Sequence, residues 1–167
     1  MLRIMENKDF NLLISNYKNQ LVGGDIQAAY SGLIKYMQQL KTHFTKEIGK
    51  EYVVGNVFPG CMDITYFYVT NDYLKSRKLK LGLVLNHSEI RFEVWLFGQT
   101  KDVQEEYWNL FKNTEWVTGT EMPEYSVVEK VIVSEPDFND MEKLSSEVID
   151  EFLGVSVELL ASVRELG

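Results

Sequence analysis

The residues best suited to chemistry lie in one stretch of the chain, residues 78–97. Two runs there alternate apolar and polar side chains, which predicts two antiparallel strands joined by a turn at Asn86-His87-Ser88-Glu89. We expect Leu85 to pair with Ile90, which places every aliphatic or phenylalanine position on one face: Leu79, Leu81, Leu83, Leu85, Ile90, Phe92, Val94 and Leu96. The opposite face combines charge with aromatic surface: Lys80, Gly82, Arg91, Glu93, Trp95 and Phe97.

Three side chains of this second face can contact a ligand in distinct ways. Arg91 can hold an anionic group, Glu93 can act as a base or hydrogen-bond acceptor, and Trp95 can stack on a ring. Gly82 is expected to leave room above the sheet. The alternative is structural: Arg91 and Glu93 form cross-strand ion pairs near Lys80, while the aromatic side chains pack beneath a helix. The sequence leaves both interpretations open.

A neighbouring strand can add to this surface. Asp63 precedes the run Ile64–Thr70, and Asn56 and Thr65 can follow it onto the same face if that strand adjoins the hairpin. The candidate ligand site is therefore made of residues from two strands or more: Asp63, Lys80, Arg91, Glu93 and Trp95. An enzyme that uses Glu93 with Asp63 or His87 as acid and base groups is the alternative.

Other kinds of site lack the required residues. A nuclease-type metal site needs a Glu-x-Lys pair, but Trp95 stands where the lysine would be, and His43 and His87 match no zinc-binding spacing. No metal ligand set is expected. The chain has no glycine-rich phosphate-binding loop and no nucleophile elbow, so we expect no cofactor. Cys61 follows Pro-Gly and is interpreted as a turn thiol rather than a nucleophile.

The charge distribution limits the partners. The net charge is −8, and residues 92–167 hold five basic and seventeen acidic side chains, whereas residues 35–91 hold nine basic and five acidic ones. The basic cluster Lys75, Arg77, Lys78 and Lys80 is small, so we expect no nucleic-acid binding. The acidic C-terminal half instead suggests a protein interaction domain with a basic partner. A single cysteine and the lack of a long apolar run predict a cytoplasmic protein without membrane insertion.

The remaining patterns define the fold. Helical spacing predicts two N-terminal helices, one near 100–112 and a long C-terminal helix over 140–164; strands are expected within 51–58, 63–70 and 126–133, and a short helix near 71–76. We therefore expect an α+β fold, with a mostly antiparallel sheet of about four to five strands centred on the hairpin at 78–97 and the helices packed on it. Length and the lack of a linker predict a single domain over residues 1–167.

Three segments of the chain also carry a resemblance. The runs MDITYF, KLKLGLVLNH and RFEVWLFGQTK are similar to those of an uncharacterised bacterial family known as a domain of unknown function. The match lies at Met62, Asp63, Thr65, Tyr66, Phe67, Asn86, His87, Arg91, Phe92, Glu93, Trp95, Leu96 and Gly98. This resemblance implies no activity. The leading hypothesis is therefore a module that binds a small molecule or a partner through the polar and aromatic face of the hairpin.

Overall fold

The computed structural model describes residues 9–167 of the chain. Its helices are α1 (Phe10–Gln20), α2 (Asp25–Ile48), α3 (Asp72–Ser76), α4 (Lys101–Phe111) and α5 (Met141–Leu166). Its strands are β1 (Val53–Phe58), β2 (Ile64–Thr70), β3 (Leu79–Asn86), β4 (Arg91–Gly98) and β5 (Val128–Val133). The chain divides into two units, residues 1–35 and 36–167, so α2 contributes to both. The prediction of one domain stays a prediction.

The five strands form one sheet in the order β1-β2-β3-β4-β5, and every neighbouring pair is antiparallel. Strand order follows chain order, since strands that are consecutive in sequence usually pair with each other. This holds even for β4 and β5, whose connection contains α4. The predicted α+β class, the strand count and the long C-terminal helix are confirmed.

Side-chain caps mark the starts of α3, α4 and α5. The side chains of Asn71, Thr100 and Asp140 accept hydrogen bonds from backbone N–H groups in the first turns of α3, α4 and α5. These acceptors satisfy donors that a helix start leaves without an intrahelical partner. Within residues 9–167, no helix combines the length and the apolar character needed to cross a bilayer.

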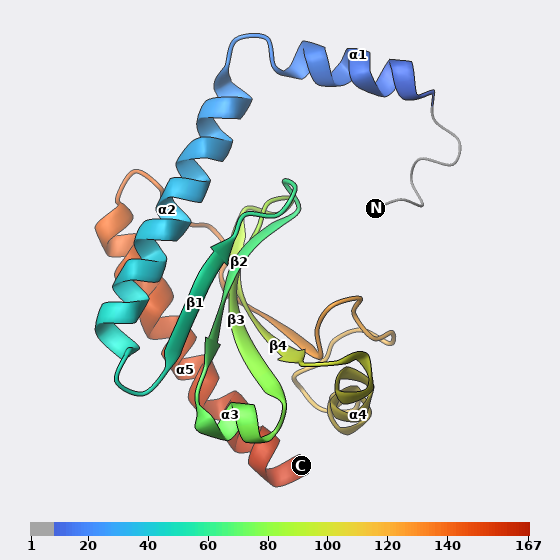
Figure 1. The fold of residues 1–167 in the computed structure, drawn as a ribbon, viewed down its shortest axis with the longest axis vertical. Helices are drawn as coiled ribbons and strands as arrows, with labels where there is room; N and C mark the ends of the chain where they lie inside the picture. Colours follow the sequence, from blue (N-terminus) through green and yellow to red (C-terminus); the bar gives the residue numbers. More distant parts are fainter. Residues whose placement is uncertain (1–8) are drawn as a thin grey trace. The chain divides into compact units, whose positions relative to one another are not determined.

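One face of the sheet, which we call the core face, carries the aliphatic side chains of the hairpin. Leu81, Leu83, Leu85, Phe92 and Val94 are fully buried there. The C-terminal half of α2 and the whole of α5 cover this face (Figure 1). Phe44 of α2 packs between the helices and the sheet. Its ring centroid lies 5.2 Å from that of Phe67 in β2 and 5.1 Å from that of Phe152 in α5.

The predicted register of the hairpin is wrong by two residues. Leu85 pairs with Phe92, and Asn86 pairs with Arg91, whereas Ile90 belongs to the turn. The Asn86 side-chain oxygen accepts hydrogen bonds from the backbone N–H groups of Ser88 and Glu89, which closes a four-residue turn that Ile90 completes with φ +48°. A shift of two residues keeps each side chain on its face. The predicted faces are therefore right, except that Ile90 is exposed instead of buried.

Candidate functional site

The second face of the sheet brings aromatic residues of β2 and β4 together. Tyr66 pairs with Val84 and Tyr68 with Gly82, while Gly82 and Lys80 pair with Trp95 and Phe97 on the other side. Paired residues of antiparallel strands point to the same side of the sheet. We call this surface the aromatic face, and its members are Ile64, Tyr66, Tyr68, Lys80, Gly82, Val84, Arg91, Glu93, Trp95 and Phe97.

The centre of the aromatic face is closely packed. Trp95 and Phe97 are each 6% exposed, and Tyr66 and Tyr68 pack against them while keeping part of their surface in solvent. The Tyr68 ring is nearly perpendicular to that of Phe97, at 88° with 5.3 Å between centroids. Lys80 places its ammonium nitrogen 4.6 Å from the centroid of the Tyr68 ring. This is a cation–π distance.

The room expected above Gly82 is filled by a side chain of the protein itself. A Cβ atom at position 82 would lie 2.6 Å from Cε2 of Phe97. The glycine therefore accommodates the Phe97 ring and leaves no space for a ligand. The sequence prediction at this position is wrong because the two-residue difference in register places Phe97 diagonally opposite Gly82.

The buried carboxylate of Glu93 is held by three donors of its own hairpin. Arg91 Nε donates to Oε1 over 2.6 Å, Asn86 Nδ2 donates to the same oxygen over 3.1 Å, and Trp95 Nε1 donates to Oε2 over 2.6 Å. Glu93 is only 1% exposed. The ion pair between Arg91 and Glu93 thus runs along one strand, whereas the ammonium of Lys80 lies over the ring of Tyr68.

Beside this cluster, the aromatic face is hollowed into a pocket of about 290 Å³. Four aromatic residues line it together with a carboxylate, an isoleucine and two glycines: Tyr66, Tyr68, Phe97, Tyr125, Asp63, Ile64, Gly60 and Gly98. Tyr125 comes from the connection between α4 and β5 and is 59% exposed. Three separate segments of the chain therefore meet at this pocket.

A tight turn between β1 and β2 positions Asp63 at the pocket. Gly60 has φ +68°, and a Cβ atom there would overlap the carbonyl oxygen of Ile64. The backbone N–H of Cys61 donates to Asp63 Oδ1 over 2.8 Å. Hydrogen bonds from the backbone of Cys61 and Ile64 lower the pKa of Asp63, so this carboxyl group is ionised at neutral pH.

Two tyrosines of the pocket, Tyr68 and Tyr125, are neutral at the same pH. Burial and a hydrogen bond with Tyr66 raise the pKa of Tyr68 to about 12. A hydrogen bond with Glu124 raises the pKa of Tyr125. The pocket therefore presents uncharged phenol rings around one negative charge.

His87 and Thr65 connect the turns at one end of the sheet. Thr65 Oγ1 donates to the carbonyl oxygen of Pro59 over 2.7 Å, so its single proton is used and it accepts from His87 Nε2, also over 2.7 Å. The backbone N–H of His87 donates to the carbonyl oxygen of Asp63 over 2.9 Å. Thr65 is fully buried on the core side, which differs from its predicted place on the ligand surface.

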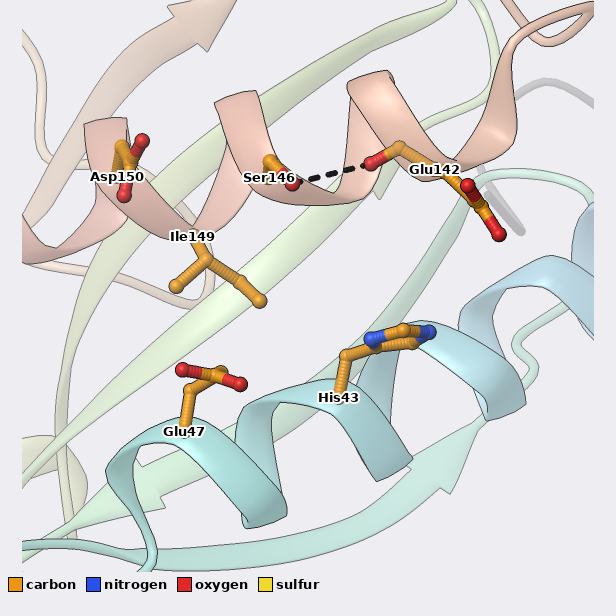
Figure 2. Close-up of a pocket in the computed structure, with 6 residues that line it drawn as sticks. All are labelled: His43, Glu47, Glu142, Ser146, Ile149 and Asp150. Atoms are coloured by element: carbon orange, nitrogen blue, oxygen red, sulfur yellow. Dashed lines mark hydrogen bonds between the residues drawn. The ribbon is translucent and has the colours of Figure 1, made fainter.

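A second, larger hollow of about 440 Å³ lies between α2 and α5 (Figure 2). His43 and Glu47 of α2 face α5, which contributes Glu142, Ser146, Ile149 and Asp150 (Figure 2). The lining is polar and acidic. Among residues 9–167, no group of three or more His, Cys, Asp or Glu side chains is arranged to hold a metal ion.

A family model described as a domain of unknown function, DUF7000, matches residues 10–163. The chain belongs to the DUF7000 family. This confirms the predicted resemblance to a domain of unknown function. Comparison with curated proteins and with solved structures found no match. The DUF7000 match spans the aromatic face and both hollows, and it brings no activity with it.

The structure of this DUF7000 domain separates the predicted site residues into three places. Arg91, Glu93 and Trp95 form the hydrogen-bonded cluster, Asp63 lines the aromatic pocket, and Lys80 lies over Tyr68. The lining tyrosines were not among the predicted site residues. The alternation of side chains along Ile64–Tyr68 is a sequence signal that could have placed Tyr66 and Tyr68 on the aromatic face. Tyr125 has no such local signal, because only the path of the α4–β5 connection brings it to the sheet.

Proposed function

We propose that this DUF7000 protein binds a small molecule in the pocket on its aromatic face. The observation that supports the proposal is the convergence of four aromatic residues and the Asp63 carboxylate from three chain segments. Ligand pockets typically combine apolar and aromatic walls with a few placed polar groups, in volumes of about 300–1,000 Å³. At about 290 Å³ the pocket fits a ligand at the small end of that range.

An acid–base enzyme is a weaker candidate. The Glu93 carboxylate has both oxygens engaged by donors of its own hairpin and is not among the residues that line the pocket. His87 donates to a buried threonine rather than facing the pocket lining. A general base must reach the proton that it removes, and neither side chain is among the residues that line the pocket.

A protein interaction domain is the second candidate function, and the hollow between α2 and α5 favours it. Three acidic residues, Glu47, Glu142 and Asp150, line this hollow, and acidic surfaces attract basic partners by electrostatic steering. A basic partner should lose affinity steeply as salt is raised, whereas a small molecule in the aromatic pocket should be less affected.

We also infer a cytoplasmic location from the single cysteine, because disulfides are common in secreted proteins.

The test of the proposal is a fragment screen by protein-observed NMR and by thermal melting. A ligand that binds only the folded protein stabilises it by about 2.7 kcal/mol at one hundred times its dissociation constant, which raises the melting temperature by several degrees. We expect hits to perturb the amide signals of Asp63, Tyr66 and Tyr125.

The matched variants are Tyr125→Ala and Tyr17→Ala. The two tyrosines are 59% and 60% exposed, but Tyr17 does not line the pocket. Tyr125→Ala should abolish binding of the hits without lowering the melting temperature of the free protein, and Tyr17→Ala should leave binding unchanged. Equal loss in both variants, or no hit at the pocket, would contradict the proposal.

A further inference from the structure

We propose that the pocket on the aromatic face selects an organic cation, an alkylated or quaternary ammonium group of small size. This inference rests on the proposed function and adds the charge of the ligand to it. It reverses the expectation from the sequence, in which Arg91 would hold an anion.

The charges of the pocket wall support a cation. Asp63 is the only residue of the lining that carries a formal charge at neutral pH, and the lining contains no lysine, arginine or histidine. The backbone N–H groups that hold the Asp63 carboxylate keep it ionised and fix its position at the pocket. A cation therefore meets one attractive charge and no opposing one from the lining.

The two basic side chains of the aromatic face contact groups of the protein itself. Arg91 Nε donates to Glu93 over 2.6 Å, and the ammonium of Lys80 lies against the ring of Tyr68, a ring of the pocket lining. Neither residue lines the pocket. An anionic ligand would thus have to approach Asp63 without a compensating cation in the wall, which is unfavourable in a partly desolvated site.

The rings supply the second attraction. The Tyr66 and Tyr68 planes meet at 68° and the Tyr68 and Phe97 planes at 88°, so Tyr68 packs edge to face against the other two lining rings in a cluster beside the pocket. The faces of aromatic rings carry negative charge density and attract cations, and cages of several rings recognise alkylated ammonium groups. Within the protein, the Lys80 ammonium at 4.6 Å from the Tyr68 centroid shows that this cluster accommodates a cation beside a ring.

The experiment compares two probes of the same shape and different charge with the full chain. Choline carries a trimethylammonium group, and 3,3-dimethyl-1-butanol replaces its nitrogen by carbon and is neutral. Titration of each probe is followed by the amide signals of the pocket residues. We expect choline to bind at least about fivefold more tightly than the neutral probe, since a partly desolvated cation–π contact is worth about that factor.

Asp63→Asn separates the charge from the shape of the pocket. Asparagine keeps the side-chain oxygen that accepts the Cys61 N–H, so the turn should persist, and thermal melting verifies the fold. Asp63→Asn should bind choline at least about fivefold more weakly than the wild type and bind the neutral probe with unchanged affinity. Tyr125→Leu should weaken the binding of choline more than that of the neutral probe, because leucine retains apolar surface but has no ring. Should Asp63→Asn fail to fold, Tyr125→Leu alone carries the comparison.

The outcomes distinguish this inference from the proposed function. Equal binding of the two probes, or pocket hits that are only neutral or anionic fragments, would overturn the cation inference and leave a small-molecule site in place. Choline affinity that is unchanged in Asp63→Asn would overturn it as well. If no fragment, whether cationic, neutral or anionic, perturbs the amide signals of the pocket residues, both proposals are wrong.

Discussion

Trp95 and Glu93, two residues apart on β4, are joined by a hydrogen bond of 2.6 Å from the indole nitrogen to carboxylate Oε2. Both side chains project from the aromatic face because alternate residues of a strand point to the same side. Arg91 and Asn86 engage the other carboxylate oxygen. The Glu93 carboxylate is therefore part of the internal packing of the hairpin.

Glu93→Gln should lower the free energy of unfolding by about 1–3 kcal/mol, because it weakens charge-assisted hydrogen bonds to Arg91 and Trp95 in a buried position. Urea denaturation measures the change. The control is Glu89→Ala at an exposed turn position, which should alter stability by less than about 0.5 kcal/mol. A Glu93→Gln protein as stable as the wild type would show that the cluster does not support the fold.

The pKa of His87 predicts a loss of stability in mild acid. Burial lowers the pKa of His87 below its ordinary value of 6.5, an effect that Asp63 partly opposes. The unfolded chain then binds a proton at a higher pH than the folded chain does. The contribution of His87 to stability is fully present above about pH 6.5 and is lost as the pH falls from there through the folded-state pKa.

His87→Gln removes this titration and can still donate toward Thr65. We expect the melting temperature of the variant to fall less than that of the wild type between pH 7.5 and pH 5.5. Ser88→Ala, at the exposed neighbouring position, is the control and should follow the wild type. Parallel profiles for wild type and His87→Gln would show that His87 is not the titrating group.

Gly82→Ala should destabilise the protein by about 1–3 kcal/mol, because the added methyl group overlaps the packed Phe97 ring. Gly154→Ala is the contrasting change. A Cβ atom at position 154 of α5 meets no atom within 4 Å, and alanine is favoured over glycine inside a helix by about 0.5–1 kcal/mol. Thermal or urea unfolding should thus show opposite signs, and a stabilising Gly82→Ala would contradict the packing of Phe97 above Gly82.

Ile90→Gly should preserve or raise stability despite the loss of an aliphatic side chain. Ile90 adopts φ +48°, a left-handed conformation that costs a β-branched residue about 1–2 kcal/mol, and its side chain is 40% exposed. If residue 90 were instead a strand residue packed on the core, as in the register predicted from sequence, Ile90→Gly would cost about 2–5 kcal/mol. Urea denaturation distinguishes the two registers.

The sequence alone determined the class of fold, the extent of most elements and the two faces of the hairpin. Those features depend on local periodicity and capping chemistry: alternate residues of a strand separate onto two faces, and side chains such as Thr100 mark a helix start wherever the chain is placed. A shift of two residues leaves that alternation intact, so the pattern could not distinguish Leu85 opposite Ile90 from Leu85 opposite Phe92. The turn chemistry of Asn86 and the left-handed Ile90 decided it.

The candidate site was decided by tertiary structure. Asp63, Phe97 and Tyr125 meet only because β2, β3 and β4 lie side by side and the connection after α4 returns to the sheet. The tertiary structure also decides which polar groups pair with each other. Arg91 and Asn86 donate hydrogen bonds to Glu93, and Asp63 is left as the charged group of the pocket lining. Composition shows which side chains can attract a ligand, but the free energy of desolvation and pairing depends on which of them the fold brings into contact.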